Sequence, residues 1–266
     1  MAAKLKSAVF VSLPATVTVA VCVPYFSCQA SIVYVPGGSP LMVNDPSLPL
    51  KGSTFAGEVD GLFLAITIIT GIAFVLVEVG LIWFVVKYRQ RPGQKAFYTH
   101  GNTRAEVIWT TIPAVTMVAL GLISNHYWVK IKGRHSVPAN AYAIAIHAKQ
   151  FEWQVTYPGA DGQLGTSDDF TVRNQLHVPV GRPVVVHLSS EDVIHSFFVP
   201  VFRVKQDAVP GMDINAWFQA TVPGTYELGC AELCGLGHYR MRAQVVVHTQ
   251  EDYDAWMKQA AQEASQ

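Results

Sequence analysis

The sequence has few charged residues and few cysteines for its length. Only 14% of the 266 residues are Asp, Glu, Lys or Arg, 50% are hydrophobic, and the formal net charge is zero. This composition is unusual for a soluble domain of this size, so part of the chain is expected in a bilayer. No nucleic-acid partner is expected. Internal repeats and low-complexity blocks are absent, and the lack of a Cys-x-x-Cys-His motif excludes a covalently attached haem c.

Charge is almost missing from two long stretches. Residues 62–86 contain a single ionisable side chain, Glu78, to which we assign no role. A helix of that length, at about 1.5 Å per residue, exceeds the roughly 30 Å hydrocarbon core of a bilayer. A second apolar run, 107–128, has Trp109 and Trp128 near its ends, where interfacial aromatics occur. We predict a transmembrane hairpin over 61–128; a buried helical hairpin is the alternative.

Basic residues set the orientation of this hairpin. The loop between the two runs holds five basic residues and one acid, which by the positive-inside rule places it on the cytoplasmic side. The protein is then a two-pass protein of the bacterial inner membrane with its C-terminal domain on the periplasmic side. Lys4 and Lys6 precede an apolar stretch, so 1–30 is predicted as a signal or N-terminal segment and 31–60 as an extended outer arm. Lipidation of Cys28 stays open, and Cys22 has no assigned role.

The pattern changes to period-two alternation from about residue 139. In 142–157 one face is apolar, with a one-residue slip before Phe151 that suggests a β-bulge. Further strands are predicted at 184–188, 225–230 and 242–248, separated by Pro/Gly turns. Such short strands favour an antiparallel β-sandwich or Greek-key barrel over 139–250. A helix is predicted over 251–266, with Thr249 as its cap.

Soft and borderline metal ligands collect in one segment, "GCAELCGLGHYRM" at 229–241. Cys230, Cys234, His238 and Met241 are spaced by four, four and three residues, with glycines that allow a tight loop. Thiolates and thioethers favour copper(I), and imidazole suits either copper state. Two thiolates in one loop can each bridge two metals, which doubles the number of ions that the loop can hold.

One more imidazole is needed, and "SSEDVIHSFFVP" offers His195 beside a strand end. Glu191 or Asp192 would orient its ring, as metal-bound imidazoles usually require. Two other readings remain open for this cluster. One is a disulfide between the two cysteines, and the other is a tetrahedral zinc site of two Cys and two His.

These segments, together with "KQDAVPG" and "HGNTRAEVIWTTIP", resemble subunit II of the haem-copper cytochrome c oxidases over roughly 60–250. The resemblance implies a cupredoxin barrel that holds a dinuclear mixed-valence copper centre, CuA. It implies that Cys230 and Cys234 bridge both coppers. His195 and Met241 would complete one copper, and His238 with the backbone carbonyl of Glu232 the other. Quinol-oxidising relatives have lost these ligands, whereas every position is filled here.

The resemblance also implies a relay role with partners. Electrons would arrive from cytochrome c or a small copper protein and pass to haem in the catalytic subunit I, where oxygen is reduced and protons are pumped; subunit III is a further partner. The Glu232 side chain would reach a magnesium or manganese ion shared with the catalytic subunit. Haem would reside only in the partner. A nitric oxide reductase with a CuA subunit and a membrane-tethered copper carrier are the alternative functions.

Three further residues take roles from the same resemblance. Glu106 matches an acid that marks a proton-channel entrance, and its alternative is a glutamate that favours the helix dipole. The usual Trp-x-Trp that receives the electron is "FEW" here, so Phe151 and Trp153 occupy its places. Residues 129–266 hold 14 acids and 11 bases, and this excess would steer a basic donor toward acids in the rim loops, namely Asp161, Asp168, Asp169, Glu191, Asp192, Asp207 and Asp213.

Overall fold

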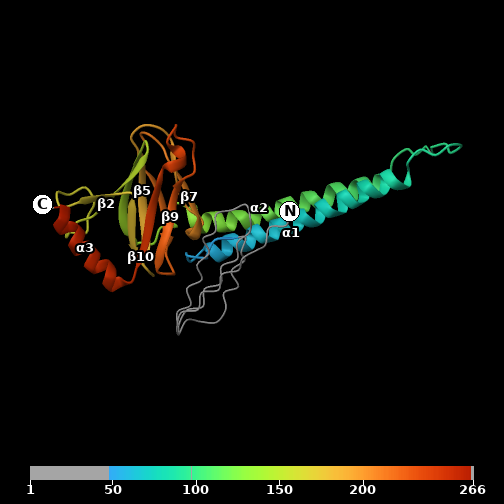
Figure 1. Cartoon of the computed structure of the whole chain (residues 1–266). Helices are drawn as coiled ribbons and strands as arrows, with labels where there is room; N and C mark the ends of the chain where they lie inside the picture. Colours follow the sequence, from blue (N-terminus) through green and yellow to red (C-terminus); the bar gives the residue numbers. More distant parts are fainter. Residues whose placement is uncertain (1–47, 97, 265–266) are drawn as a thin grey trace, which may run out of the picture. The chain divides into compact units, whose positions relative to one another are not determined.

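The computed structural model describes residues 48–96 and 98–264 (Figure 1). Its first two elements are long apolar helices, α1 (Ala56–Lys87) and α2 (Thr103–Lys132). Both are long and apolar enough to cross a membrane, and their most apolar windows are not buried within the chain. Helix α1 begins inside the stretch assigned to the outer arm. The predicted signal segment, Cys22, Cys28 and the arm up to residue 47 lie outside the described residues.

The helix ends carry the signals expected of stable termini. The side chain of Asn102 caps α2 by accepting a hydrogen bond from Ala105 N at 3.1 Å. Glu58 lies in the first turn of α1 and Lys87 in the last turn, where each charge complements the helix dipole. Because the apolar side chains along both helices are exposed, these surfaces need lipid or a protein partner.

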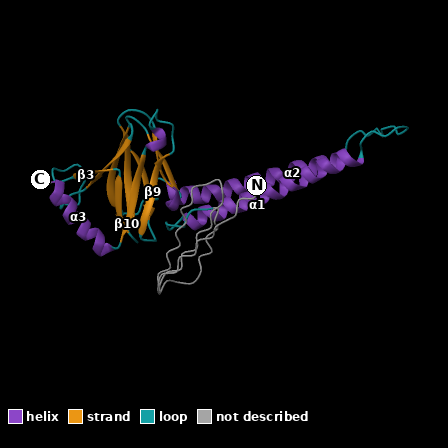
Figure 2. Ribbon diagram, in the orientation of Figure 1, coloured by secondary structure: helices purple, strands orange, loops and turns teal. Residues whose placement is uncertain are grey.

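The described residues form ten strands in two five-stranded sheets, ordered β3-β2-β1-β5-β8 and β4-β10-β9-β6-β7. Figure 2 shows these strands gathered in one β-domain. The strands are β1 (Tyr142–Lys149), β2 (Glu152–Tyr157), β3 (Phe170–Arg173), β4 (Gln175–Pro179), β5 (Pro183–Ser190), β6 (His195–Val199), β7 (Val204–Ala208), β8 (Ile214–Gln219), β9 (Gly224–Cys230) and β10 (Arg242–His248). Short 3₁₀ turns lie at η1 (Pro200–Phe202) and η2 (His238–Arg240). A large apolar core unites the two sheets, as in a cupredoxin barrel.

Two details differ from the sequence expectation. The sheets are mixed rather than antiparallel, because β1 pairs with β5 and β4 with β10 in parallel. The slip before Phe151 is a two-residue turn, not a bulge: Lys149 pairs with Glu152 and Ala148 with Trp153. A bulge and a two-residue turn shift the alternation equally, and the turn lacks the Gly or Asn that usually marks it.

The chain's last described helix, α3 (Gln250–Ala264), packs on the barrel at β3, β4 and β10. Thr249 caps it as predicted, its Oγ1 accepting from Asp252 N at 3.2 Å. Trp256 stacks on the His177 ring with centroids 4.0 Å apart and meets Tyr157 edge-on at 4.9 Å. The helix therefore covers the barrel end to which β2 runs, away from the Gln150–Phe151 turn.

Candidate metal centre

The ligand loop, residues 230–241, leaves β9 at Cys230 and returns to β10 after Met241. A backbone hydrogen bond from Cys230 N to Met241 O, 3.1 Å long, closes its neck. Below the neck, Gly229 pairs with Arg242 and the antiparallel ladder continues. The loop is thus a short excursion from two paired strands, so both ends are fixed by the sheet.

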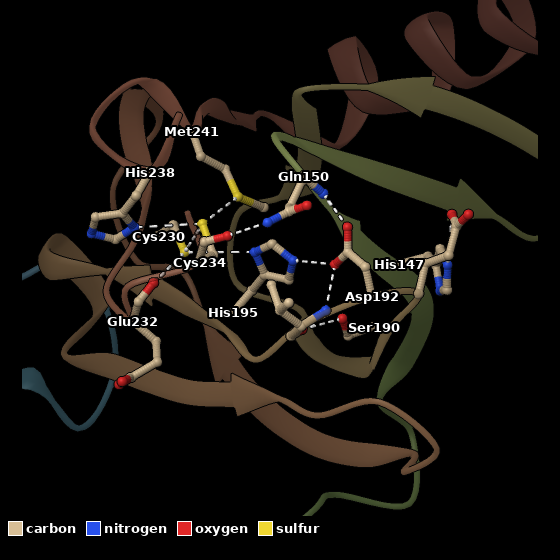
Figure 3. A network of polar contacts seen from close by, with 12 residues as sticks. His147, Gln150, Ser190, Asp192, His195, Cys230, Glu232, Cys234, His238 and Met241 are labelled. Carbon is tan, nitrogen blue, oxygen red and sulfur yellow. Dashed lines mark hydrogen bonds and ion pairs between the residues drawn. The ribbon is translucent and has the colours of Figure 1, made fainter. Parts of the chain in front are cut away.

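Sulfur and imidazole atoms converge inside this loop (Figure 3). The Cys230 and Cys234 sulfurs lie 3.8 Å apart, Cys234 Sγ lies 3.7 Å from Met241 Sδ, and Cys234 Sγ lies 3.6 Å from His238 Nδ1. A disulfide needs an S–S distance of about 2.05 Å. Both cysteines are free, so the disulfide alternative is not realised.

His195 reaches the sulfur atoms from β6, the strand that neighbours β9. It is the first residue of β6, which pairs with β9 through Phe197 and Cys230. The ring is fully buried, its Nδ1 lies 3.9 Å from Cys230 Sγ, and its Nε2 lies 2.8 Å from Asp192 Oδ1. A hydrogen bond donated by Nε2–H to this carboxylate leaves the Nδ1 lone pair directed at the sulfurs. The ligand atoms of His195, Cys230 and Cys234 all lie within 4.8 Å of one another.

Asp192 is the acid that orients this ring, as one of the two predicted carboxylates. It also accepts hydrogen bonds from Gln150 N at 2.7 Å and Val193 N at 2.6 Å. Desolvation is the largest effect on its pKa and raises it, but these donors and the imidazole together hold the pKa of Asp192 below its usual value. Glu191 instead lies 3.6 Å from His147, away from the ring.

Glu232 presents two groups in different directions. Its carbonyl oxygen lies 3.2 Å from Cys230 Sγ, whereas its carboxylate points away from the sulfurs and is exposed (Figure 3). The carbonyl is therefore available to the ligand cluster. The carboxylate is available to a group outside this chain.

Burial disfavours a free thiolate in this cluster. Desolvation, followed by the neighbouring Cys230, raises the pKa of the Cys234 thiol to about 12. Without a cation, Cys234 stays a neutral thiol at physiological pH. A bound cation would supply the charge that stabilises the anion, because thiolates are the form that binds metals.

The β1–β2 turn lies directly against the ligand loop, a contact that the sequence did not reveal. Gln150 Nε2 donates to Cys234 O at 2.5 Å (Figure 3). A side-chain carbon at Gly237 would meet the Phe151 ring at 2.4 Å, and Gly235 has a φ of +130° that other residues rarely adopt. Both glycines are therefore needed for the turn to approach. The missed residue, Gln150, carries no signal in the sequence, because glutamine is common at strand ends.

The remaining predicted residues fall at different depths. Phe151 is half-buried beside the loop, and Trp153 is fully buried with its ring edge-on to His195 at 6.2 Å. Trp153 thus lies in the core beside the His195 imidazole rather than on the surface. Glu106 is exposed in the first turn of α2.

The acids expected in the rim loops do not all lie at the same end of the β-domain. Asp161, Asp168 and Asp169 surround Thr166 in the β2–β3 loop, at the opposite end of β2 from the Gln150–Phe151 turn. The reason is the Gln150–Phe151 turn, which lies against the ligand loop. Strand β2 begins at this turn and runs away from the loop, so the β2–β3 loop lies at the other end of the strand. Asp192 lies at the metal end, and Asp207 pairs with Ser196, the neighbour of His195.

Comparisons with known proteins agree with this architecture. The profile of the cytochrome c oxidase subunit II transmembrane domain matches residues 46–126, and that of the subunit II periplasmic domain matches 144–249. The chain is 37% identical to the alternative cytochrome c oxidase subunit 2 of Bradyrhizobium diazoefficiens over 72% of this chain and 76% of that protein. It is 34% identical to cytochrome c oxidase subunit 2 of Thermostichus vulcanus, over 80% and 78%.

Among solved structures, the periplasmic domain of subunit II of cytochrome oxidase from Bradyrhizobium japonicum is similar, at 28% identity and a TM-score of 0.43. That match covers 48% of this chain and 99% of the other. Two membrane-spanning helices are followed by a periplasmic β-domain, in the order of the two matched profiles. The chain therefore belongs to the cytochrome c oxidase subunit II family.

Proposed function

We propose that this chain carries a dinuclear copper centre and relays electrons within a terminal cytochrome c oxidase. It accepts them one at a time from cytochrome c, or a small copper protein, on the periplasmic side. It passes them to haem in the catalytic subunit, where oxygen is reduced and protons are pumped. The carrying observation is the convergence of two thiols, two imidazole Nδ1 atoms and one thioether within a single loop and its neighbouring strand.

The donor set fits copper better than the alternatives. Metal–sulfur bonds are about 2.3 Å long, so two sulfurs that share an ion lie at most about 4.6 Å apart. The observed 3.8 Å between Cys230 and Cys234 meets that limit. Zinc with two Cys and two His would leave Met241 without a role, although its sulfur lies 3.7 Å from Cys234 Sγ inside the buried cluster. Cys230, Cys234, His195, His238 and Met241 would hold the copper, which would supply one-electron redox chemistry when bound.

The chain's own contribution to electron transfer is rigidity. The ligand-loop neck is pinned by the Cys230–Met241 hydrogen bond, and the His195 ring is held by Asp192 in a fully buried position. Gln150 fixes the Cys234 carbonyl from the outside. Ligands that move little between oxidation states favour rapid electron transfer, because little reorganisation accompanies each transfer.

Two exposed acids are proposed to serve other steps. The Glu232 carboxylate would hold a magnesium or manganese ion at the border with the catalytic subunit, since it faces away from the sulfur cluster and hard cations prefer oxygen ligands. Glu106 would admit protons at the cytoplasmic mouth of α2. Subunits I and III of the oxidase are the proposed partners.

A cytochrome c donor is proposed over quinol because the complete ligand set would have no use in a quinol oxidase. Phe151, half-buried against the ligand loop, is the proposed contact with the donor. Trp153 is too deeply buried to touch a docked protein, so its place is on the path behind Phe151.

The test is copper stoichiometry and spectroscopy on the intact, purified oxidase. Two coppers per chain in this subunit and a seven-line electron paramagnetic resonance spectrum from a shared electron are expected, and both should vanish in Cys230→Ser. One copper or none would refute the proposal. Turnover on oxygen rather than nitric oxide excludes the reductase alternative. Copper that resists chelators excludes the carrier alternative.

A further inference from the structure

A buried ion pair joins the first membrane helix to the β-domain, and the proposed function does not use it. Arg203 Nε donates to Asp60 Oδ1 at 2.7 Å and Nη2 to Asp60 Oδ2 at 3.0 Å. The two side chains are only 10% and 8% exposed. A guanidinium that binds a carboxylate through two parallel bonds fixes orientation as well as distance.

The same guanidinium also binds three backbone carbonyls. Nη1 donates to Pro200 O at 2.6 Å and Leu50 O at 3.3 Å, and Nη2 donates to Pro49 O at 2.6 Å. Arg203 thus connects η1 of the β-domain, the segment before α1, and α1 itself. Its backbone has a φ of 57°, a left-handed conformation that non-glycine residues rarely adopt. The chain tolerates this conformation at the residue that makes all these contacts.

Neighbouring contacts attach the same parts. The segment before α1 runs along the β-domain, with Gly52 N bonded to Val201 O at 2.9 Å and Thr54 N to Gln219 O at 3.2 Å. At the end of α2, Trp217 Nε1 donates to Ile131 O at 2.9 Å. The outer ends of both membrane helices are therefore bound to the β-domain, and the largely buried Arg203–Asp60 pair is one of the contacts that bind them.

The location of Arg203 links this joint to the metal centre. Arg203 immediately precedes β7, and β7 pairs with β6 from Val204–Val199 at one end to Ala208–His195 at the other. The joint therefore holds one end of a hairpin whose other end carries a proposed copper ligand. Buried ion pairs add little net stability, because the loss of hydration offsets their attraction, and some are retained because they select one arrangement.

We propose that Arg203 and Asp60 are positioning residues for electron transfer. They fix the orientation of the β-domain on the membrane hairpin, and so set the distance from the ligand loop to the haem of the catalytic subunit. This inference rests on the proposed relay function. It concerns the rate of electron exit, not the binding of copper or of the donor.

The test compares intact oxidase complexes with Asp60→Asn, Arg203→Lys and the control Glu58→Gln. The control changes an acid on the same helix whose carboxylate pairs with Lys130 of α2 rather than with the β-domain. Both joint variants should slow copper-to-haem transfer by roughly threefold to tenfold, since small displacements of reacting groups have large effects on rates. The copper spectrum and donor-to-copper rate should match the wild type. In both joint variants, the backbone amide hydrogens of Gly52 and Thr54 should exchange with solvent faster than in the wild type, whereas the amide of Cys230 should exchange at the same rate.

Two results would overturn the inference. One is faster exchange at Gly52 and Thr54 with an unchanged copper-to-haem rate. The other is a slower rate with an altered copper spectrum, which would place the effect in the ligand loop. Arg203→Lys keeps the positive charge, so this variant alone can decide the test if the complex with Asp60→Asn does not assemble. If the wild-type complex lacked copper-to-haem transfer, the proposed function would fail; normal transfer in the variants would reject only the positioning role.

Discussion

Replacing Asp192 tests whether the buried carboxylate tunes the metal centre through His195. The ring nitrogen Nε2 lies 2.8 Å from Asp192 Oδ1. Loss of such an outer partner typically lowers metal affinity about 10–100-fold, or about 1.4–2.7 kcal/mol. Asp192→Asn keeps an acceptor oxygen, and the side chain is 30% exposed so that water can compensate. We therefore expect about a tenfold loss for Asn, at the low end of that range.

Asp192→Ala should fall at the high end, about 100-fold, because it also leaves the N–H groups of Gln150 and Val193 without their acceptor. The assay is competition for copper between the full-length protein in detergent and a chelator of known affinity. Glu191→Gln is the matched control, since this neighbouring acid faces His147. Copper affinities of Asp192→Ala and the control that agree within twofold would refute the reasoning, provided that both metal-free proteins melt at the same temperature.

Four other predictions concern Met241, Glu106, Phe151 and His177. Met241→Leu should leave copper bound but shift its reduction potential in a voltammetric titration, and an unaltered potential would reject Met241 as a ligand. Glu106→Gln should slow steady-state oxygen turnover without changing the copper spectrum, and normal turnover would exclude the channel role. Phe151→Ala should slow oxidation of reduced cytochrome c in stopped flow while copper-to-haem transfer persists; unchanged kinetics would move the donor contact elsewhere. Burial, with nearby His248, lowers the pKa of His177 to about 4. As pH falls from about 6.5, this histidine therefore gains its proton in the unfolded chain first, and the free energy of unfolding should drop by at most about 3.4 kcal/mol by about pH 4. Thermal melts of His177→Gln should show a shallower pH dependence than the wild type.

Residues with distinctive chemistry were predictable from the sequence. Metal ligands belong to few residue types and need short spacings, so the ligand loop could be recognised in the sequence. It holds Cys230, Cys234, His238 and Met241. His195 was recognisable because the set needed one more imidazole and this histidine lies beside a strand end, after Glu191 and Asp192. Strands β9 and β10, which flank the ligand loop, follow from plain alternation, and so does β5. All three end within two residues of their predicted limits, whereas His195 lies on β6.

Features that depend on distant contacts were not predictable. The two-residue turn at Gln150 and Phe151 was mistaken for a bulge, since both shift the alternation alike. The contact from Gln150 to the Cys234 carbonyl joins residues 84 apart, and the Arg203–Asp60 pair joins residues 143 apart. No local pattern signals such a pairing, because each partner is an ordinary polar residue until the fold brings the two together.

The hydrogen bond between Cys230 and Met241 closes the neck of the ligand loop and separates the loop from the paired part of β9 and β10. From Gly229 and Arg242 onward, β9 and β10 are joined by backbone hydrogen bonds that do not involve the side chains of the loop. All the candidate ligands therefore lie in one contiguous loop and at one residue of β6, so changes confined to these positions would alter or remove a metal site. Cys234 and Met241 also belong to the hydrophobic core, so their replacements must fill the same space. Loss of a redox centre would then be an easy evolutionary step, and gaining one on the same frame would need few changes.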